Sequence, residues 1–117
     1  MNLLSSLFGP PLPSLNALEL SEKLKNGKRP LVVDVRQPEE YRLGHIAGAK
    51  LIPLGDLSKR INELPKDKEI VCVCASGNRS HSATKLLVNA GYNAFDMKGG
   101  MLMWQRTQLP IKKGNAA

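Results

Sequence analysis

The sequence predicts a single α/β domain built around a mainly parallel sheet. Short apolar runs of strand length alternate with segments whose apolar residues recur at helical spacing, and the connections between them are short. The chain has 117 residues, the size of one domain, and 42% of them are hydrophobic, which is enough for one core. No run approaches the ~18 consecutive apolar residues of a membrane span, so we expect none.

The first 13 residues predict an extended N-terminal arm. They end in Gly9-Pro10-Pro11-Leu12-Pro13, which cannot continue a helix. Residues 1–8 are apolar but lack the basic segment of a secretory signal, so we do not expect a signal peptide. Their side chains are expected to pack on the domain or on a partner.

A helix and a strand are predicted after the arm. Asn16, with Glu19 three residues later, has the pattern of a capping box, and Gly27 supplies a stop after apolar residues at helical spacing. The apolar run 31–33 then leads into Asp34. Such a continuous run is typical of a strand covered on both faces, as in a parallel sheet.

A second and a third helix are predicted on either side of another short strand. Pro38 stands at the first position of a short helix, with acidic residues near the positive end of the helix dipole, and Gly44 ends it. A strand is expected over 49–52. A helix capped by Asp56 follows and ends before Pro65.

The clearest strand is predicted over 70–73, which is apolar and rich in β-branched residues. A polar turn over 74–79 follows and leads into a helix over about 80–90. A last strand is expected over 94–97, and a short helix around Trp104. Strands that alternate with helices in this way favour parallel pairing.

The two cysteines, Cys72 and Cys74, are not expected to form a disulfide. Side chains two apart in a strand point to the same face, and so short a closed loop would distort the backbone. Free cysteines favour a reducing cytoplasm as the location. Cys72 lies between two valines and is expected in the core, with a role as a resolving thiol as the less favoured alternative.

The chain is basic, with 17 Lys and Arg against 10 Asp and Glu and a formal net charge of +7. That charge is compatible with small anions, an acidic partner or nucleic acid. The basic residues are scattered, however, and only 4% of residues are aromatic, so surfaces for stacking bases are scarce. We therefore expect no nucleic-acid partner.

Cys74 is the candidate nucleophile. It ends the strand over 70–73 and precedes a helix, the position at which open α/β sheets bind ligands. The loop that follows can direct backbone N–H groups to one spot near the helix N-terminus, and Arg79 adds positive charge. A cysteine there is expected to be rich in thiolate and nucleophilic. The alternative is a buried structural cysteine, which the polar, glycine-containing loop disfavours.

Three parts of the sequence together resemble the family of single-domain rhodaneses, which are sulfurtransferases. They are the active-site loop in Cys74–Ser80, the upstream signature in Asp34–Arg36, Pro38–Tyr41 and Gly44–Ala49, and the downstream signature in Gly99–Gly100 with Trp104. The resemblance runs in the family's order from about Asn16 to Pro110.

The resemblance implies a rhodanese-like α/β fold, with a mainly parallel five-stranded sheet and helices on both faces. The rhodanese domain would cover residues 14–111, between the arm over 1–13 and a flexible tail over 112–117. We expect it to be a monomer.

The resemblance also implies sulfur transfer of the thiosulfate sulfurtransferase type. The Cys74 thiolate would take a sulfane sulfur from a small anionic donor such as thiosulfate, or from a persulfide. The resulting Cys74 persulfide would pass its sulfur to cyanide, a thiol or a protein acceptor, with no metal or organic cofactor. The substrate-binding residues would be Ala75, Ser76, Gly77, Asn78, Arg79 and Ser80, and Ser80 would also cap the next helix.

Two features of this loop bear on the substrate. Four residues separate Cys74 from Arg79, whereas five separate the cysteine from the arginine in cysteine phosphatases. A phosphoryl group needs the wider ring, so the shorter loop favours sulfur transfer over phosphatase activity. Many rhodaneses have a basic residue directly after the cysteine, where this chain has Ala75. The missing cation weakens binding of a dianion, which favours a persulfide or a protein donor. The rival hypothesis is a rhodanese-fold sulfur relay or protein-binding module with little thiosulfate activity.

Three further polar residues are predicted to have structural roles. His45 is expected to bond nearby backbone rather than act as a base. Asp34 and Arg36 are expected to form an ion pair or to brace loops near the site.

Overall fold

The computed structural model describes residues 11–117, so residues 1–10 of the arm predicted for residues 1–13 lie outside the described residues. Five strands form one sheet in the order β1-β5-β4-β2-β3, and every neighbouring pair is parallel. The strands are β1 (Ser14–Leu15), β2 (Leu31–Asp34), β3 (Lys50–Leu51), β4 (Ile70–Val73) and β5 (Ala94–Met97). The predicted α/β fold with a parallel five-stranded sheet is confirmed.

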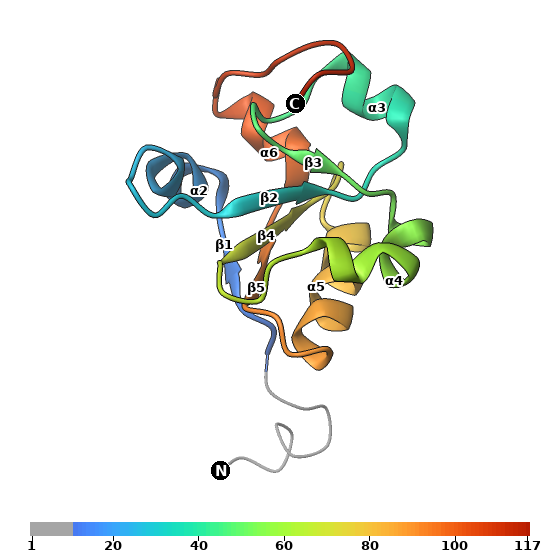
Figure 1. Ribbon diagram of the computed structural model, residues 1–117. Coiled ribbons are helices and arrows are strands. Elements are labelled where there is room, and N and C mark those ends of the chain that lie inside the picture. Colours follow the sequence, from blue (N-terminus) through green and yellow to red (C-terminus); the bar gives the residue numbers. More distant parts are fainter. Residues whose placement is uncertain (1–10) are drawn as a thin grey trace.

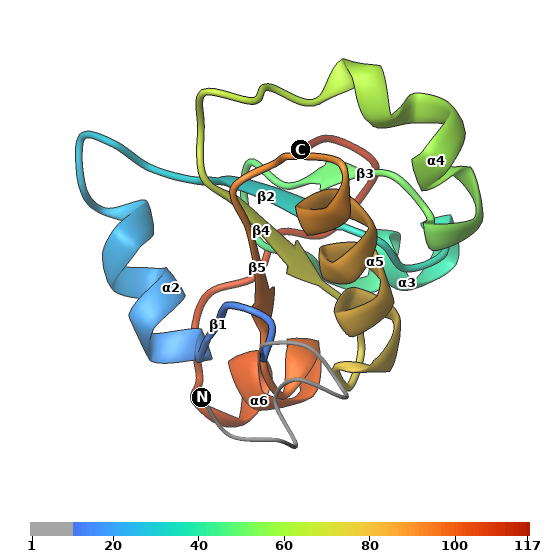
Figure 2. The same ribbon diagram turned by 90° about the horizontal axis from the view of Figure 1, so that it is seen from below.

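Helices cover both faces of the sheet. They are α2 (Ala17–Leu24), α3 (Pro38–Leu43), α4 (Leu57–Arg60), α5 (Asn78–Asn89) and α6 (Gly100–Arg106). Helices α2 and α6 lie on one face, and α4 and α5 on the other (Figures 1 and 2). Each face has its own buried apolar cluster. Because side chains alternate along β4, Val71 and Val73 lie in the cluster under α2 and α6, and Cys72 lies in the cluster under α4 and α5.

The helix starts follow the local sequence signals closely. Asn16 Oδ1 accepts a hydrogen bond from the Glu19 N–H at 2.8 Å, and Glu19 Oε1 accepts one from the Asn16 N–H at 2.9 Å. This is the predicted capping box of α2. Helix α3 begins at Pro38 and has Gly44 as its C-terminal cap, as predicted.

Two helices differ from their predicted bounds. The helix predicted after Asp56 is divided into a 3₁₀ turn over Leu54–Asp56, the single turn α4 and a second 3₁₀ turn over Ile61–Glu63. Helix α5 begins at Asn78, two residues earlier than expected, because Gly77 at φ +117° ends the loop. Ser80 lies inside the helix and does not cap it, so that prediction is wrong.

Strand β1 was not predicted because it has only two residues and directly follows a proline. It adds to the edge of the sheet beside β5, with Ser14 opposite Asp96. The backbone carbonyl of Pro13 extends this pairing by accepting a hydrogen bond from the Asp96 N–H at 2.9 Å.

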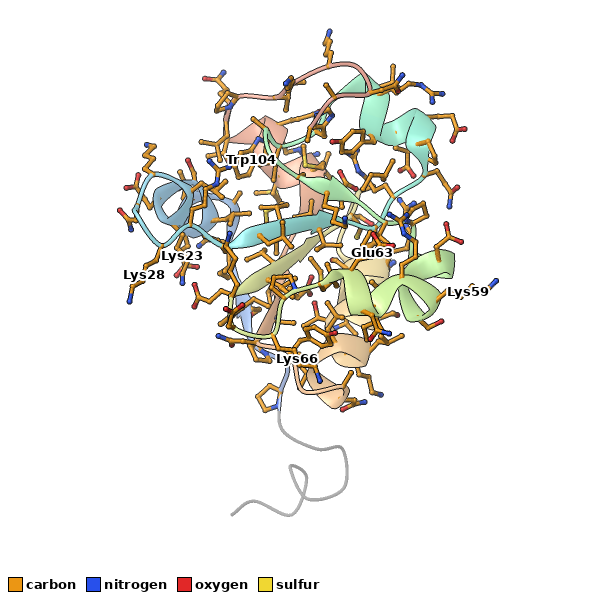
Figure 3. The ribbon with its side chains drawn as sticks, in the orientation of Figure 1. Lys23, Lys28, Lys59, Glu63, Lys66 and Trp104 are labelled. Carbon is orange, nitrogen blue, oxygen red and sulfur yellow. The ribbon has the colours of Figure 1, made fainter. Side chains whose placement is uncertain are left out.

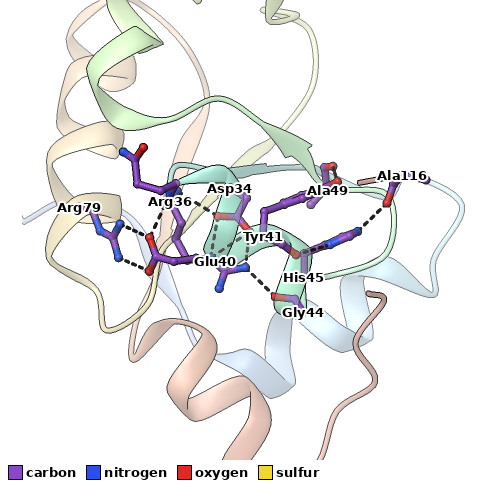
Figure 4. A network of polar contacts seen from close by, with 10 residues as sticks. Asp34, Arg36, Glu40, Tyr41, Gly44, His45, Ala49, Arg79 and Ala116 are labelled. Atoms are coloured by element: carbon purple, nitrogen blue, oxygen red, sulfur yellow. Dashed lines mark hydrogen bonds and ion pairs between the residues drawn. The ribbon is translucent and has the colours of Figure 1, made fainter. Parts of the chain in front are cut away.

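The C-terminal residues 112–117, predicted as a flexible tail, make hydrogen bonds to the domain in the structure. Lys112 pairs with His45 as an antiparallel bridge, and the ring Nε2 of His45 lies 2.8 Å from the Ala116 carbonyl (Figure 4). The same ring is fully buried, stacks on Tyr41 at 3.6 Å and bonds the Tyr41 carbonyl through Nδ1 at 2.8 Å. Both ring nitrogens thus contact backbone, as the structural role of His45 predicts.

Basic side chains are exposed on several elements of the fold. Lys28 and Lys59 are exposed at opposite sides of the molecule, whereas Trp104 is buried (Figure 3). Among the described helices, none has the length and apolar character needed to cross a membrane.

Candidate active site

Cys74 lies at the carboxyl edge of the sheet, in the first position after the central strand β4. Its side chain faces α5 and is only 1% exposed. Parallel α/β sheets bind ligands at this edge, where strand ends and helix N-termini meet. The structure therefore places the predicted nucleophile where the fold supports chemistry.

The Cys74 sulfur contacts one backbone donor and one hydroxyl. The Gly77 N–H donates to Sγ at 3.0 Å. Sγ in turn donates to Ser80 Oγ at 3.3 Å, and Ser80 Oγ donates to Asp96 Oδ1 at 2.6 Å. The loop thus folds back over the Cys74 sulfur, and Ser80 in the first turn of α5 contacts the sulfur as well.

Helix α6 holds the loop from the other side. The Met101 N–H donates to the Cys74 carbonyl at 2.8 Å, and the Leu102 N–H donates to the Ala75 carbonyl at 3.0 Å. Gly100 makes this approach feasible, because a Cβ on it would lie 2.5 Å from both carbonyl oxygens. The Gly99–Gly100 pair singled out in the sequence is therefore part of the architecture of the loop.

The predicted loop residues differ in how they meet solvent. Ser76 and Asn78 are exposed, while Ala75, Gly77 and Arg79 are partly buried. The structure brings Gly77 and Ser80 into direct contact with the Cys74 sulfur. That the whole set binds substrate remains a prediction.

Arg79 is engaged by a carboxylate from α3. Its two terminal nitrogens donate to Glu40 Oε1 and Oε2 at 2.7 Å and 2.8 Å, so the pair is bidentate (Figure 4). This hydrogen bonding holds the pKa of Glu40 at about 2, below its ordinary 4.5, and raises the pKa of Arg79. The charge that sequence analysis assigned to anion binding is thereby largely neutralised.

The Glu40–Arg79 pair predicts a pH dependence of stability. Because the pKa of Glu40 is lower in the folded chain, its contribution is complete above about pH 4.5 and is lost as the pH falls toward 2. The pair is one-third exposed, so the contribution is about 1 kcal/mol or less. Urea titrations over that pH range should show the unfolding free energy of wild type falling more steeply than that of Glu40→Gln.

Glu39→Gln is the matched control for this measurement. Glu39 is an exposed neighbour that takes part in none of the described ion pairs. Its variant should follow the wild-type pH curve. Parallel curves for wild type and Glu40→Gln would contradict the assignment.

A second ion pair lies at the carboxyl end of strand β2, between its last residue Asp34 and Arg36. Arg36 Nη2 lies 2.8 Å from Asp34 Oδ2 and also donates to the Gly44 carbonyl at 2.8 Å (Figure 4). Asp34 is 1% exposed and stands opposite Val73, the residue before Cys74. The predicted Asp34–Arg36 ion pair is confirmed, and it links the end of β2 to the loop after α3.

Two residues that the structure brings to the site, Glu40 and Asp96, were not predicted from the sequence. Asp96 had a detectable signal, since it is a charged residue inside the apolar strand β5. Glu40 had none, because its partner Arg79 lies 39 residues away in the sequence.

The site contains no recognisable metal centre. Among residues 11–117, no three His, Cys, Asp or Glu side chains gather as a metal ion would require.

Cys72 is fully buried, and burial raises the pKa of its thiol to about 12. Its core position is as predicted.

Comparison with known proteins identifies the family. The sequence matches the rhodanese-like domain over residues 16–107, most of the chain. The chain belongs to the rhodanese-like family. This rhodanese-like chain is 36% identical over 98 residues to a protein named sulfurtransferase from Allochromatium vinosum, with 83% of this chain and 92% of that protein covered.

A second relative and a solved structure agree with this family assignment of the rhodanese-like chain. It is 33% identical to the putative sulfurtransferase YtwF of Bacillus subtilis, with 85% of this chain and 96% of that protein covered. A crystal structure of a rhodanese-related protein from Thermoplasma volcanium superposes with a TM-score of 0.81 at 36% identity and covers 86% of this chain and 97% of that one. The family predicted from the loop and its flanking signatures is confirmed.

Proposed function

We propose that this chain is a sulfurtransferase that carries a sulfane sulfur as a persulfide on Cys74. One observation carries the proposal: the Gly77 N–H lies 3.0 Å from the Cys74 sulfur, inside a closed loop at the start of α5. Backbone donors at a helix N-terminus stabilise an anion there. Relatives named as sulfurtransferases support sulfur transfer as the general chemistry.

With thiosulfate as donor, the proposed cycle has two displacements at sulfur. The Cys74 thiolate attacks the outer sulfur, the sulfur–sulfur bond of thiosulfate breaks, and sulfite leaves with the electron pair. An acceptor such as cyanide then takes the terminal sulfur and leaves as thiocyanate. The Cys74 thiolate is restored, and no external oxidant or reductant is needed.

Intact-protein mass spectrometry tests the proposal directly. Brief exposure to thiosulfate should add one sulfur atom, and subsequent cyanide should remove it. The Cys74→Ser variant should gain no sulfur because it lacks the thiolate nucleophile, whereas Cys72→Ser should still load, since Cys72 lies in the core. Sulfur uptake that persists in Cys74→Ser would contradict the proposal.

The second candidate function is a relay that takes sulfur from a protein or small persulfide and has little activity with thiosulfate. Two features of the loop favour it. Arg79 is the only charged side chain in the loop 74–80, and Glu40 occupies its guanidinium. Ala75 adds no charge of its own. The loop thus offers little positive charge to bind a dianion. A persulfide donor carries less negative charge than thiosulfate and depends less on such a cation.

Adding a cation beside the nucleophile should therefore increase thiosulfate turnover. Ala75 is partly exposed, so an arginine there can reach solvent at the rim of the loop. We expect Ala75→Arg to raise kcat/KM for thiosulfate by roughly 3- to 10-fold through attraction of the dianion. Steady-state thiocyanate formation measures this change.

Ala75→Gln is the matched control, because it adds a polar side chain without the charge. It should leave kcat/KM near the wild-type value, and the Ala75→Arg gain should shrink at high ionic strength. Equal gains in both variants would show that charge is not the missing element.

A further inference from the structure

Behind the nucleophile lies a buried carboxylate that the proposed sulfur chemistry does not use. Asp96 is 6% exposed and stands opposite Cys72 in the β4–β5 register, on the face of the sheet that α5 covers. Its Oδ1 accepts a hydrogen bond from Ser80 Oγ at 2.6 Å. A distance this short is typical of a hydroxyl bound to an ionised carboxylate.

The hydroxyl of Ser80 has a single hydrogen and three neighbours that can accept it. They are Asp96 Oδ1 at 2.6 Å, the Gly77 carbonyl at 3.2 Å and the Cys74 sulfur at 3.3 Å. The carboxylate is the nearest of the three and the only charged one while Cys74 is a thiol, so the Ser80 hydroxyl donates its hydrogen bond to Asp96. An oxygen lone pair of Ser80 therefore faces the sulfur, and it accepts the S–H of the Cys74 thiol.

We propose that Asp96 is a positioning residue that acts through Ser80 to keep Cys74 as a thiol and to disfavour its free thiolate. A thiolate facing the lone pair of Ser80 loses the hydrogen bond that the thiol donates. The Gly77 N–H acts in the opposite direction, because it donates to the sulfur. Gly77 therefore stabilises the Cys74 thiolate and Ser80 destabilises it, and Asp96 determines the strength of the Ser80 effect.

The same geometry treats a persulfide differently from a thiolate, a consequence that rests on the proposed function. A Cys74 persulfide carries its negative charge on the terminal sulfur, one atom beyond Sγ. The lone pair of Ser80 then faces an uncharged sulfur and is no longer unfavourable. Asp96 therefore favours the sulfur-loaded and thiol states over the free thiolate.

The elements packed around Cys74 carry other charged or titratable groups. On α5, Arg79 is paired with Glu40 of α3 and His81 is exposed. The Asp34–Arg36 pair lies at the end of β2, and Lys98 is exposed after β5. On β4, the pKa of Cys72 is raised to about 12. All of these groups stay the same when Ser80 and Asp96 alone are changed.

The test is the pH dependence of Cys74 alkylation by iodoacetamide, followed by peptide mass spectrometry so that adducts on Cys74 and Cys72 are separated. In Ser80→Ala the thiol loses its acceptor, and the midpoint of the profile should fall by about one pH unit, which is a tenfold gain in thiolate below the midpoint. In Asp96→Asn a neutral amide oxygen replaces the carboxylate and competes less strongly for the Ser80 hydrogen, so the hydroxyl can turn toward a thiolate and the midpoint should also fall.

A double variant separates the route through Ser80 from a direct effect of charge. In the Ser80→Ala background, Asp96→Asn should add little further shift, because the hydroxyl that couples the two groups is absent. Equal shifts from Asp96→Asn in both backgrounds would overturn the role of Ser80. A rise of the midpoint in Ser80→Ala would overturn the proposal, because it would mean that Ser80 donates its hydrogen to the thiolate.

Thr84→Val is the matched control on the same helix. Thr84 is buried one turn beyond Ser80, and its hydroxyl donates to the Ser80 carbonyl at 2.8 Å. Its midpoint should equal that of wild type, and a similar fall there would overturn the assignment to Ser80. If Asp96→Asn does not fold, as judged by circular dichroism, the sign of the Ser80→Ala shift decides by itself.

Alkylation needs no sulfur donor, so this test is independent of persulfide formation. A shifted midpoint without sulfur uptake would contradict the proposed function and support the role of Asp96. Sulfur uptake with an unshifted midpoint in Asp96→Asn and Ser80→Ala would overturn the role of Asp96 alone.

Discussion

Arg36→Met should destabilise the protein by about 3–5 kcal/mol, because it leaves the buried carboxylate of Asp34 without its counter-charge. Asp34 is 1% exposed, and Arg36 binds both of its oxygens while also donating to the Gly44 carbonyl. A loss of this size is a large part of the roughly 5–15 kcal/mol that stabilises a typical domain. Urea unfolding at neutral pH, compared at constant m-value, measures it.

Removing both charges should recover much of that loss. In Asp34→Asn/Arg36→Met, no uncompensated charge stays buried, so the double variant should be more stable than Arg36→Met alone. Arg60→Met is the exposed control: Arg60 pairs with Glu63 on the surface, and its loss should change stability little. A double variant as unstable as Arg36→Met would show that packing, rather than the unpaired charge, causes the effect.

Much of the fold could be predicted because its signals are local. The capping box of Asn16 and Glu19 fixes the start of α2 within four residues of chain. The apolar run of β4 and the glycine-containing loop after it suffice to place Cys74 at the edge of the sheet. Each of these features depends on neighbours in the sequence, which is what a pattern can report.

The elements that were missed depend on contacts from elsewhere in the chain. Strand β1 is two residues long and exists because β5 offers an edge to pair with. The break of the predicted helix after Asp56 into α4 and two 3₁₀ turns has no proline or glycine inside Leu57–Glu63 to signal it. Tertiary contacts of this kind commonly override local propensity.

The site shows the same division between local and distant contacts. The sequence of the loop indicates an anion cradle, since its backbone N–H groups lead into a helix N-terminus and Arg79 adds positive charge there. It does not show that Glu40 takes up that arginine, or that Asp96 bonds Ser80 from another strand. The balance of charge around Cys74 is therefore a property of the folded chain.

Gly100→Ala should both destabilise the domain and displace the loop that holds Cys74. Gly100 has φ +58°, and a Cβ there would lie 2.5 Å from the Cys74 and Ala75 carbonyl oxygens. These atoms are backbone, so the loop itself must move. We expect a loss of about 2–4 kcal/mol from strain and overlap. If Cys74 carries sulfur as proposed, its loading from thiosulfate should slow by at least roughly tenfold, since small displacements of a reacting group are costly.

Gly114→Ala separates this overlap from backbone strain alone. Gly114 also has a positive φ, +100°, but no described atom lies within 4 Å of the Cβ position. We expect it to lose about 1–2 kcal/mol from the positive φ and, if Cys74 loads sulfur as proposed, to load at the wild-type rate. The comparison combines urea unfolding with the rate of sulfur gain by mass spectrometry. If Gly100→Ala loads sulfur as fast as Gly114→Ala, the contact between α6 and the loop does not position Cys74, and the loop must hold its sulfur through Gly77 and Ser80 alone.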